Sequence, residues 1–347
     1  MVNLLGLTMD ELKAFATEMG EKPFRGKQLF VWINRGAGSF QEMTDLPKSF
    51  REKLEETAYI GLPQLLDMQV DKADGTRKFL WGFPGPDGEP DEEATVESVF
   101  MKYKYGNSLC VSSQIGCRMG CGFCASALGG FVRNLTSGEM LGQVLAAERE
   151  TKQTINHIVV MGMGEPFDNY DALSGFLKLL HDPAGKNMSY RNMTVSTSGL
   201  VPGIRKFAAD FPQAGLAISL HRLTDEGRSA IMPVNRRYPL TELLGAAREY
   251  TQATGRRITF EYALIRGEND SDQDVQLMIQ KLRGMLCHVN LIPLNDVKET
   301  GFKGSGRARA NQIAEELNRS GISATVRREL GSDIDGACGQ LRLHSKK

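Results

Sequence analysis

From residue 109 onward, the sequence alternates between short apolar runs and longer stretches with helical periodicity. The short runs are LCVSS, HIVVM, NMTVS, GLAISL, RITFEYAL, CHVNLIPL and SATVRR. This alternation predicts an α/β fold with parallel strands and right-handed crossovers. No G-x-G-x-x-G follows the first strand, which counts against a dinucleotide-binding Rossmann fold. Spacing alone leaves two architectures open, a full or partial (β/α) barrel and an open doubly wound sheet.

Capping signals support the helical stretches. TSGEMLGQVLAAERET has Thr136 and Glu139 at the spacing of a capping box, and TMDELKAFATEMG has Thr8 and Glu11 at the same spacing. Before residue 109, helical signals give way to the strand-like runs KFLWGF and ESVFMKYKYG around the turn-rich PGPDGEPDEE. We therefore expect a helical accessory domain over 1–57, a β extension or linker over 58–102, a core barrel over 103–341 and a basic tail over 342–347.

Composition narrows the class of protein. The 347 residues carry a formal net charge of zero, so bulk charge does not suit the chain to coat nucleic acid or a membrane. The sequence has no run of 18 apolar residues and no secretory signal at its N-terminus. We therefore expect a cytoplasmic protein in a reducing compartment, where clustered cysteines serve as metal ligands or catalysts before structural disulfides. We also expect a monomer.

Four of the six cysteines lie in the stretch CVSSQIGCRMGCGFCAS. Cys117, Cys121 and Cys124 have the spacing C-x3-C-x2-C, and Cys110 precedes them. One interpretation is a structural zinc site with Cys110 as fourth ligand, but zinc motifs usually contain two C-x2-C pairs. The other is a [4Fe–4S] cluster on three cysteines, which leaves one iron open for a substrate or cofactor. The spacing favours the iron–sulfur interpretation.

Small and polar residues follow the ends of several predicted strands. In GMGEP, the glycines allow close backbone approach, and the glutamate with its surrounding backbone could accept a hydrogen bond from an ammonium group. Each motif alone is typical of an ordinary turn, but together they converge on the mouth of a (β/α) barrel, where such enzymes keep their sites. These residues are Gly162, Gly164, Glu165, Ser196, Ser198, Ser219, His221 and Asn295.

The cysteines outside the C-x3-C-x2-C motif divide into two kinds. Cys287 opens an apolar strand and is predicted to be a small buried hydrophobe. Cys338 lies in GSDIDGACGQL, a glycine- and aspartate-rich loop that is a poor place to bury a thiol. We therefore predict that Cys338 and Cys110 are two thiols that face each other across the barrel mouth.

The cysteine motif, with Phe123 before its last cysteine, resembles the signature of the radical S-adenosylmethionine (SAM) superfamily. Together with GMGEPFDN, STSG, SLH, CHVNLIPLN and DIDGACGQL, it closely resembles the RlmN/Cfr family of RNA adenine-methylating radical SAM enzymes. The resemblance runs from about Glu97 to Leu341, and the helical N-terminus fits that family's accessory domain. It implies a partial (β/α)6 barrel, a [4Fe–4S] cluster and two molecules of SAM per turnover.

The resemblance also implies roles for single residues. Cys338 would become S-methylcysteine, Cys110 would release the protein–RNA adduct through a transient disulfide with Cys338, and Glu97 in VESV would be the proton acceptor. Gly336 departs from the family, which commonly has alanine there. The cluster ligands would be Cys117, Cys121 and Cys124, and the SAM contacts would be Gly164, Glu165, Ser196, Ser219, Leu220, His221 and Asn295.

The resemblance implies RNA as the substrate and a flavodoxin-type electron donor as a partner. RlmN-type members methylate C2 of an adenine in the peptidyl-transferase centre of 23S rRNA and of the adenine 3′ of the anticodon in tRNA. Cfr-type members methylate C8 of the same ribosomal adenine. CASALGG, GEPFDN and CHVNLIPLN favour C2. Contact with RNA is expected from the accessory domain and from the basic residues of the last fifty positions. A rival of another class is a non-enzymatic, zinc-stapled RNA-binding module, which would be colourless.

Overall fold

The computed structural model describes residues 1–85, 90–293, 302–328, 330–334, 336 and 340–341. Two predicted site residues, Asn295 and Cys338, lie outside the described residues, as does the predicted basic tail. All strand-like runs counted from residue 109 form strands, so the predicted α/β fold is confirmed.

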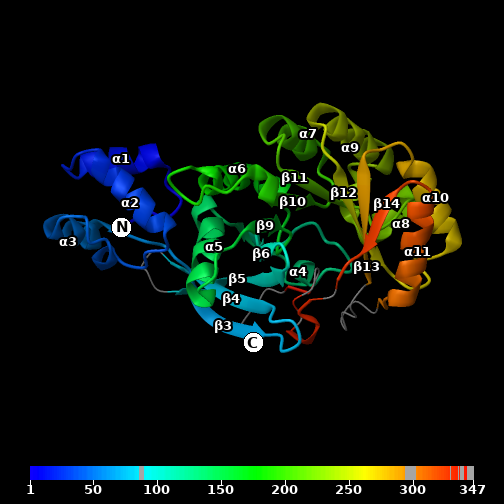
Figure 1. Ribbon diagram of the computed structural model, residues 1–347, viewed down its shortest axis with the longest axis horizontal. Coiled ribbons are helices and arrows are strands. Elements are labelled where there is room, and N and C mark those ends of the chain that lie inside the picture. The colour runs from blue at the N-terminus through cyan, green and yellow to red at the C-terminus, as the bar shows by residue number, and fades with distance from the viewer. Residues whose placement is uncertain (86–89, 294–301, 329, 335, 337–339, 342–347) are drawn as a thin grey trace.

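A ten-stranded sheet runs through the molecule in the order β14-β13-β12-β11-β10-β9-β6-β5-β4-β3 (Figure 1). Strands β6 and β9 to β14 pair in parallel, and β3 to β6 pair antiparallel. Because β3 and β14 are the edges, the barrel is partial. Its strands are β3 (Gln64–Val70), β4 (Arg77–Pro84), β5 (Pro90–Tyr103), β6 (Gly106–Val111), β9 (His157–Val160), β10 (Met193–Thr197), β11 (Gly215–Ser219), β12 (Ile258–Leu264), β13 (Cys287–Pro293) and β14 (Ser323–Val326).

Helices connect the parallel strands and cover the outer face of the sheet (Figure 1). Alternate residues of these strands, such as Val195, Ile218 and Phe260, are fully buried, which gives the outer face its apolar core. The predicted capping box of Thr136 and Glu139 is present at the start of α5. The helices are α4 (Ala125–Leu128), α5 (Ser137–Thr151), α6 (Tyr170–His181), α7 (Val201–Asp210), α8 (Asp225–Ile231), α9 (Leu240–Thr254), α10 (Asp272–Leu282) and α11 (Arg307–Arg319).

Short elements complete the connections. A small second sheet precedes α5, and 3-10 turns lie between several of the strands and helices. These elements are β7 (Gln114–Gly116), β8 (Phe131–Asn134), η2 (Pro166–Asn169), η3 (Tyr190–Asn192), η4 (Pro233–Arg236) and η5 (Ser332–Ile334).

The N-terminal helices form one end of the long axis of the molecule (Figure 1). Thr8 and Glu11 make the predicted capping box of α1. The segment packs against α5 so closely that a Cβ on Gly6 would lie 2.5 Å from the Cα of Gly138. Its elements are β1 (Val2–Asn3), α1 (Met9–Glu18), α2 (Phe24–Asn34), η1 (Phe40–Glu42), α3 (Lys48–Thr57) and β2 (Ala58–Tyr59), which pairs with β1.

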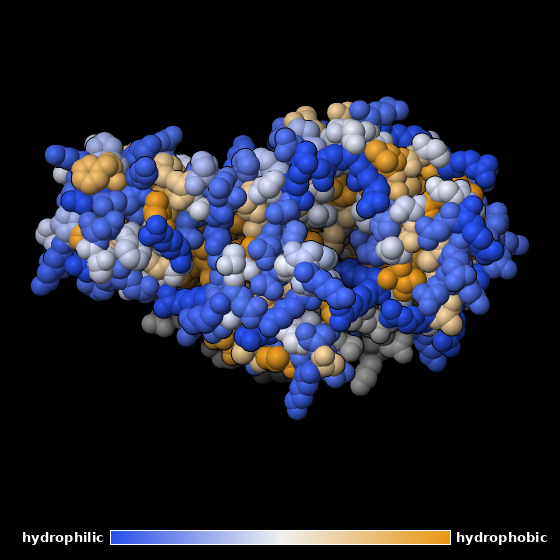
Figure 2. All heavy atoms as spheres, viewed as in Figure 1, coloured by the Kyte–Doolittle hydropathy of each residue, from blue (hydrophilic) through white to orange (hydrophobic). Residues whose placement is uncertain are grey.

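The predicted β extension is part of the barrel sheet, because β5 pairs directly with β6. The described part of the C-terminal segment packs back onto it. The Gly331 N–H donates to Asp74 at 3.1 Å, and the Ser126 hydroxyl donates to the Leu341 carbonyl at 2.7 Å. No helix in the described ranges is long and apolar enough to cross a membrane. Hydrophilic side chains cover most of the face in Figure 2, with apolar ones in separate patches.

Candidate active site

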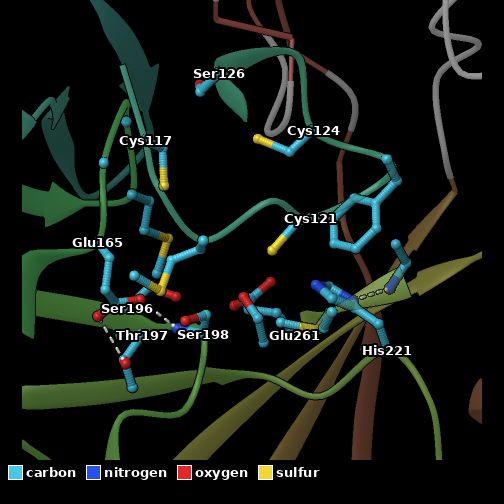
Figure 3. A pocket seen from close by; sticks show the side chains of 18 of the residues that line it. Cys117, Cys121, Cys124, Ser126, Glu165, Ser196, Thr197, Ser198, His221 and Glu261 are labelled. Carbon is cyan, nitrogen blue, oxygen red and sulfur yellow. Dashed lines mark hydrogen bonds between the residues drawn. The ribbon is translucent and has the colours of Figure 1, made fainter. Parts of the chain in front are cut away.

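A pocket lies at the carboxyl ends of the parallel strands, between the cysteine loop and the inner face of the sheet (Figure 3). The three cysteines of the C-x3-C-x2-C motif stand on one side of it. Most of the predicted SAM contacts stand on the other, as the barrel architecture requires. The lining residues that the sequence predicted are Cys117, Cys121, Cys124, Gly162, Gly164, Glu165, Ser196, Ser198, Ser219 and His221.

The cysteine loop, between β7 and α4, is shaped by backbone contacts. Gly116 has φ +71°, and a Cβ there would lie 1.9 Å from the Gly130 carbonyl oxygen, so only glycine fits. Burial raises the pKa of Cys117 to about 12 and raises that of Cys121 further. Free thiolates are therefore disfavoured in this loop. A bound cation removes that penalty, because thiol ligands lose their protons to the metal.

Two kinds of metal site were predicted for these cysteines, a zinc ion and a [4Fe–4S] cluster. In the described part of the chain, no three His, Cys, Asp or Glu side chains converge closely enough to hold one metal ion. Cys110, the predicted fourth zinc ligand, lies buried on β6 and is not among the described lining residues. A [4Fe–4S] cluster binds each thiolate at a different iron, so its ligands stand around a larger body. Three thiols around one end of the pocket suit such a cluster.

Glu165 organises the opposite wall. Its buried carboxylate accepts hydrogen bonds from the Thr197 hydroxyl at 2.8 Å, the Ser198 N–H at 2.7 Å and the Phe167 N–H at 3.0 Å. Burial raises its pKa, and these donors oppose the shift. Gly164 before it has φ +101°, and a Cβ there would meet the Gln114 side chain at 2.6 Å. The carboxylate thus ties the end of β9 to the end of β10.

His221 lies at the far end of this wall and is neutral. Its Nδ1 accepts a hydrogen bond from the Ala263 N–H at 2.9 Å, and its ring meets Phe123 edge to face at 4.7 Å between centroids. Burial, with a smaller effect of the Arg228 charge, lowers its pKa to about 3. The Nε2 atom therefore carries the proton.

Arg228 on α8 is a site residue that the sequence did not predict. Its side chain is fully buried and donates to the Ser198, Ser219 and Leu220 carbonyls at 2.5 to 3.2 Å and to Asn235 at 3.0 Å. Burial lowers its pKa to about 10, while the negative charge of Asp225 opposes that shift. One guanidinium therefore fixes the ends of β10 and β11, where SAM contacts are predicted. Leu220 takes part through its backbone and is not among the described lining residues.

Glu97 and Cys110 lie on neighbouring strands, β5 and β6. The Glu97 carboxylate is buried and pairs with Lys78 at 3.2 Å. The Glu97 carbonyl accepts a hydrogen bond from Ser112 at 2.6 Å. The register pairs Cys110 with Val99, so Cys110 and Glu97 share one face of the sheet. Neither is among the described lining residues of the pocket.

A second residue that the sequence did not predict, Glu261, lines the pocket from β12. It is a lone charge in the apolar strand ITFEYAL, and that pattern could have indicated an inward-facing acid. Nothing local marks Arg228, which lies among other charged residues in TDEGRSAIM. Its burial arises from contacts distant in sequence.

Known proteins resemble the chain over nearly its whole length. The family model for the ribosomal RNA large subunit methyltransferase N-terminal domain matches residues 2–60, and the radical SAM superfamily model matches residues 111–279. A probable dual-specificity RNA methyltransferase RlmN from Clostridium novyi (strain NT) is 49% identical over 99% of this chain and 98% of its own. A protein of the same name from Pelotomaculum thermopropionicum is 50% identical over 98% of this chain and 91% of its own.

A solved structure agrees with the fold. The crystal structure of a radical SAM methyltransferase from Sphaerobacter thermophilus matches 99% of this chain and 100% of its own, with a TM-score of 0.92 and 44% identity. The predicted methyltransferase is confirmed, which argues against the zinc-stapled binding module. Membership of the radical SAM superfamily implies a [4Fe–4S] cluster and SAM. The chain belongs to the RlmN family of radical SAM RNA methyltransferases.

Proposed function

We propose that this enzyme methylates C2 of adenine in two RNAs, 23S rRNA at the peptidyl-transferase centre and tRNA at the adenine 3′ of the anticodon. The observation that carries the proposal is the pocket that sets three cluster thiols opposite the Glu165 and His221 wall. The name dual-specificity RNA methyltransferase, borne by relatives at about half identity over the full chain, supports two RNA substrates.

Different residues of the pocket would bind the cluster and SAM. Cys117, Cys121 and Cys124 would hold the cluster, and the backbone around Gly164 and Glu165 would meet the ammonium group of SAM. When bound, the cluster and SAM supply an electron, a methyl group and a 5′-deoxyadenosyl radical. The wall is held in place before any ligand arrives, because its two buried charged side chains bond to protein groups.

Three residues outside the described lining carry the proposed chemistry on RNA. Cys338 would take the methyl group on sulfur, and Leu341, close to it in sequence, lines the pocket. Glu97 would accept the ring proton after the carbon–carbon bond forms, and its ion pair with Lys78 orients its carboxylate. The thioether bridge then needs a second thiol to release it, which would be Cys110 on the strand beside Glu97.

The remaining features of the proposal follow the sequence predictions. Residues 1–57 form the accessory domain that would contact RNA. A flavodoxin-type electron donor, two molecules of SAM per turnover, a monomeric state and a cytoplasmic location stay predictions.

The test is the position of the methyl group. The enzyme, purified and reconstituted without oxygen, is incubated with SAM, a reductant and unmodified RNA, and the digested RNA is analysed by mass spectrometry against nucleoside standards. We expect 2-methyladenosine, and none with Cys121→Ala. A product dominated by 8-methyladenosine would contradict the proposal and favour Cfr-like chemistry.

A further inference from the structure

Among the described residues, no protein group donates a hydrogen bond to one oxygen of the Glu261 carboxylate. The residue is 6% exposed and lies between Ser198 and His221, across the pocket from Cys121 (Figure 3). Its Oε2 accepts a hydrogen bond from the Asn290 amide at 2.9 Å and lies 3.8 Å from Nη1 of Arg327. No hydrogen bond to its Oε1 is found among the described residues, and Glu261 lines the pocket. Glu165, on the same wall, uses both of its oxygens on protein donors.

A carboxylate oxygen in a narrow, largely buried pocket is less well hydrated than one at the surface, so a hydrogen-bond donor on a ligand can stabilise it. Burial raises the pKa of Glu261, and the Arg327 charge and the Asn290 amide oppose that shift. A ligand that donates a hydrogen bond to Oε1 would complete the site. The chemistry of the carboxylate therefore selects a donor group, such as an amine, over a carbonyl.

The sheet register shows from where such a ligand can come. Ser219, Glu261, Asn290 and Thr325 are consecutive partners across β11 to β14, so they lie on one inward-facing row. Thr325 at the β14 end of this row is exposed. The row thus joins the enclosed pocket to a solvent-exposed wall, along which a large substrate can approach.

We propose that Glu261 is a specificity residue that accepts a hydrogen bond from the exocyclic amine of the target adenine in RNA. The inference rests on the proposed function, because it concerns the base that is methylated. Adenine places an amine donor next to the acceptor N1, which suits a carboxylate flanked by the donors Asn290 and Arg327. Guanine and uracil place a carbonyl at the position of the amine, where it would repel the carboxylate.

SAM also contains an adenine, so the amine that donates to Glu261 could belong either to SAM or to the target base in RNA. The row of inward-facing residues favours RNA, because it leads to the exposed wall at Thr325. The experiment is arranged so that the two sources give different results.

The test combines one substitution with one change in the RNA. In Glu261→Gln, the Asn290 donor requires the amide oxygen at the Oε2 position, so the amide NH2 faces the pocket and opposes an amine. Single-turnover methylation is measured with RNA that carries adenosine or purine riboside, which lacks the amine, at the target. We expect wild type to react about 10- to 100-fold slower with purine riboside. We expect Glu261→Gln to lose a similar factor with adenosine and to treat the two RNAs alike.

Glu148→Gln is the matched control. Glu148 is a partly buried carboxylate on α5 that pairs with Lys186, and it is not among the described lining residues of the pocket. This variant should keep the wild-type preference for adenosine. Dissociation constants for SAM and for each RNA, with thermal unfolding midpoints, are measured on all three proteins.

Three results would overturn the inference. The first is a Glu261→Gln variant that keeps the wild-type preference for adenosine, whatever its rate or stability, since a structural role predicts equal losses on both RNAs. The second is weakened SAM binding with unchanged RNA affinity, which would assign the carboxylate to SAM. The third is a wild-type enzyme that methylates neither RNA, which would overturn the proposed function itself.

Discussion

The inner face of the barrel is built differently in its two halves. In the half formed by β9 to β11, the buried polar side chains of Glu165, His221 and Arg228 bond to protein groups. In the half formed by β12 to β14, Glu261 has an oxygen without a protein donor among the described residues, and Thr325 is exposed. Buried charged side chains that bond to protein groups hold the strand ends in place. A buried carboxylate oxygen without such a partner is free to accept a hydrogen bond from a ligand. The enclosed half is therefore preformed, as the proposed cofactor site requires, and the open half suits the proposed role in substrate binding.

The largest expected effect compares a cysteine of the pocket with a buried cysteine on a strand of the open half. Cys121→Ala should abolish iron binding and SAM cleavage, because a three-ligand cluster site has no spare thiolate. Cys287→Ala, at the start of β13, should keep both, since Cys287 is a buried packing residue not among the described lining residues. Iron content and the visible spectrum of anaerobically purified protein measure the difference. Wild-type iron in Cys121→Ala would contradict the assignment.

The next effect concerns turnover without loss of the cluster. Cys110→Ala should retain iron and attack RNA but stall as a covalent protein–RNA adduct, because the proposed releasing thiol is missing. The adduct is a slow band in denaturing gels that ribonuclease collapses. The double variant Cys110→Ala/Cys338→Ala should form none. A Cys110→Ala protein that loses iron would instead make Cys110 a metal ligand.

The two arginines allow the halves to be compared in stability. Arg228→Met should lower the free energy of unfolding by about 3–5 kcal/mol, because it leaves buried carbonyls without donors. Arg327→Met should lower it less, since that side chain is one quarter exposed and its ion pair with Glu261 is long, at 3.8 Å. Denaturant titration of both variants measures the difference. Equal losses would mean that the open half is as tightly built as the enclosed one.

Local signals predicted much of this architecture. The strands of the barrel and the capping boxes at Thr8 and Thr136 follow from periodicity and cap chemistry within a few residues. Glu165 and His221 were predicted because they follow strand ends in a recognisable motif. Arg228 was not, because its four bonds join segments that only the folded chain brings together. The pairing of β5 with β6, which adds the predicted extension to the barrel, was likewise not predicted, because strand pairing is a contact of the folded chain.

The smallest expected effect is on the pH dependence of the free energy of unfolding, to which a histidine in each half contributes differently. His221 has its pKa lowered to about 3 by burial, whereas an unfolded histidine titrates near 6.5. Its contribution to stability is complete above pH 6.5 and is lost as pH falls toward 3, because only the unfolded chain takes up the proton. Between pH 7.5 and 5.5 this linkage should lower the free energy of unfolding by about 1.4 kcal/mol. His221→Asn, which tolerates the φ of +54° at this position, should remove that part of the pH dependence.

His288 on the open wall also has its pKa lowered by burial, but it is only half-buried and bonds to the hydroxyls of Ser323 and Thr325. His288→Asn should therefore change the slope less. Urea titrations at both pH values test this, and identical slopes in wild type and His221→Asn would show that His221 titrates normally in the folded protein.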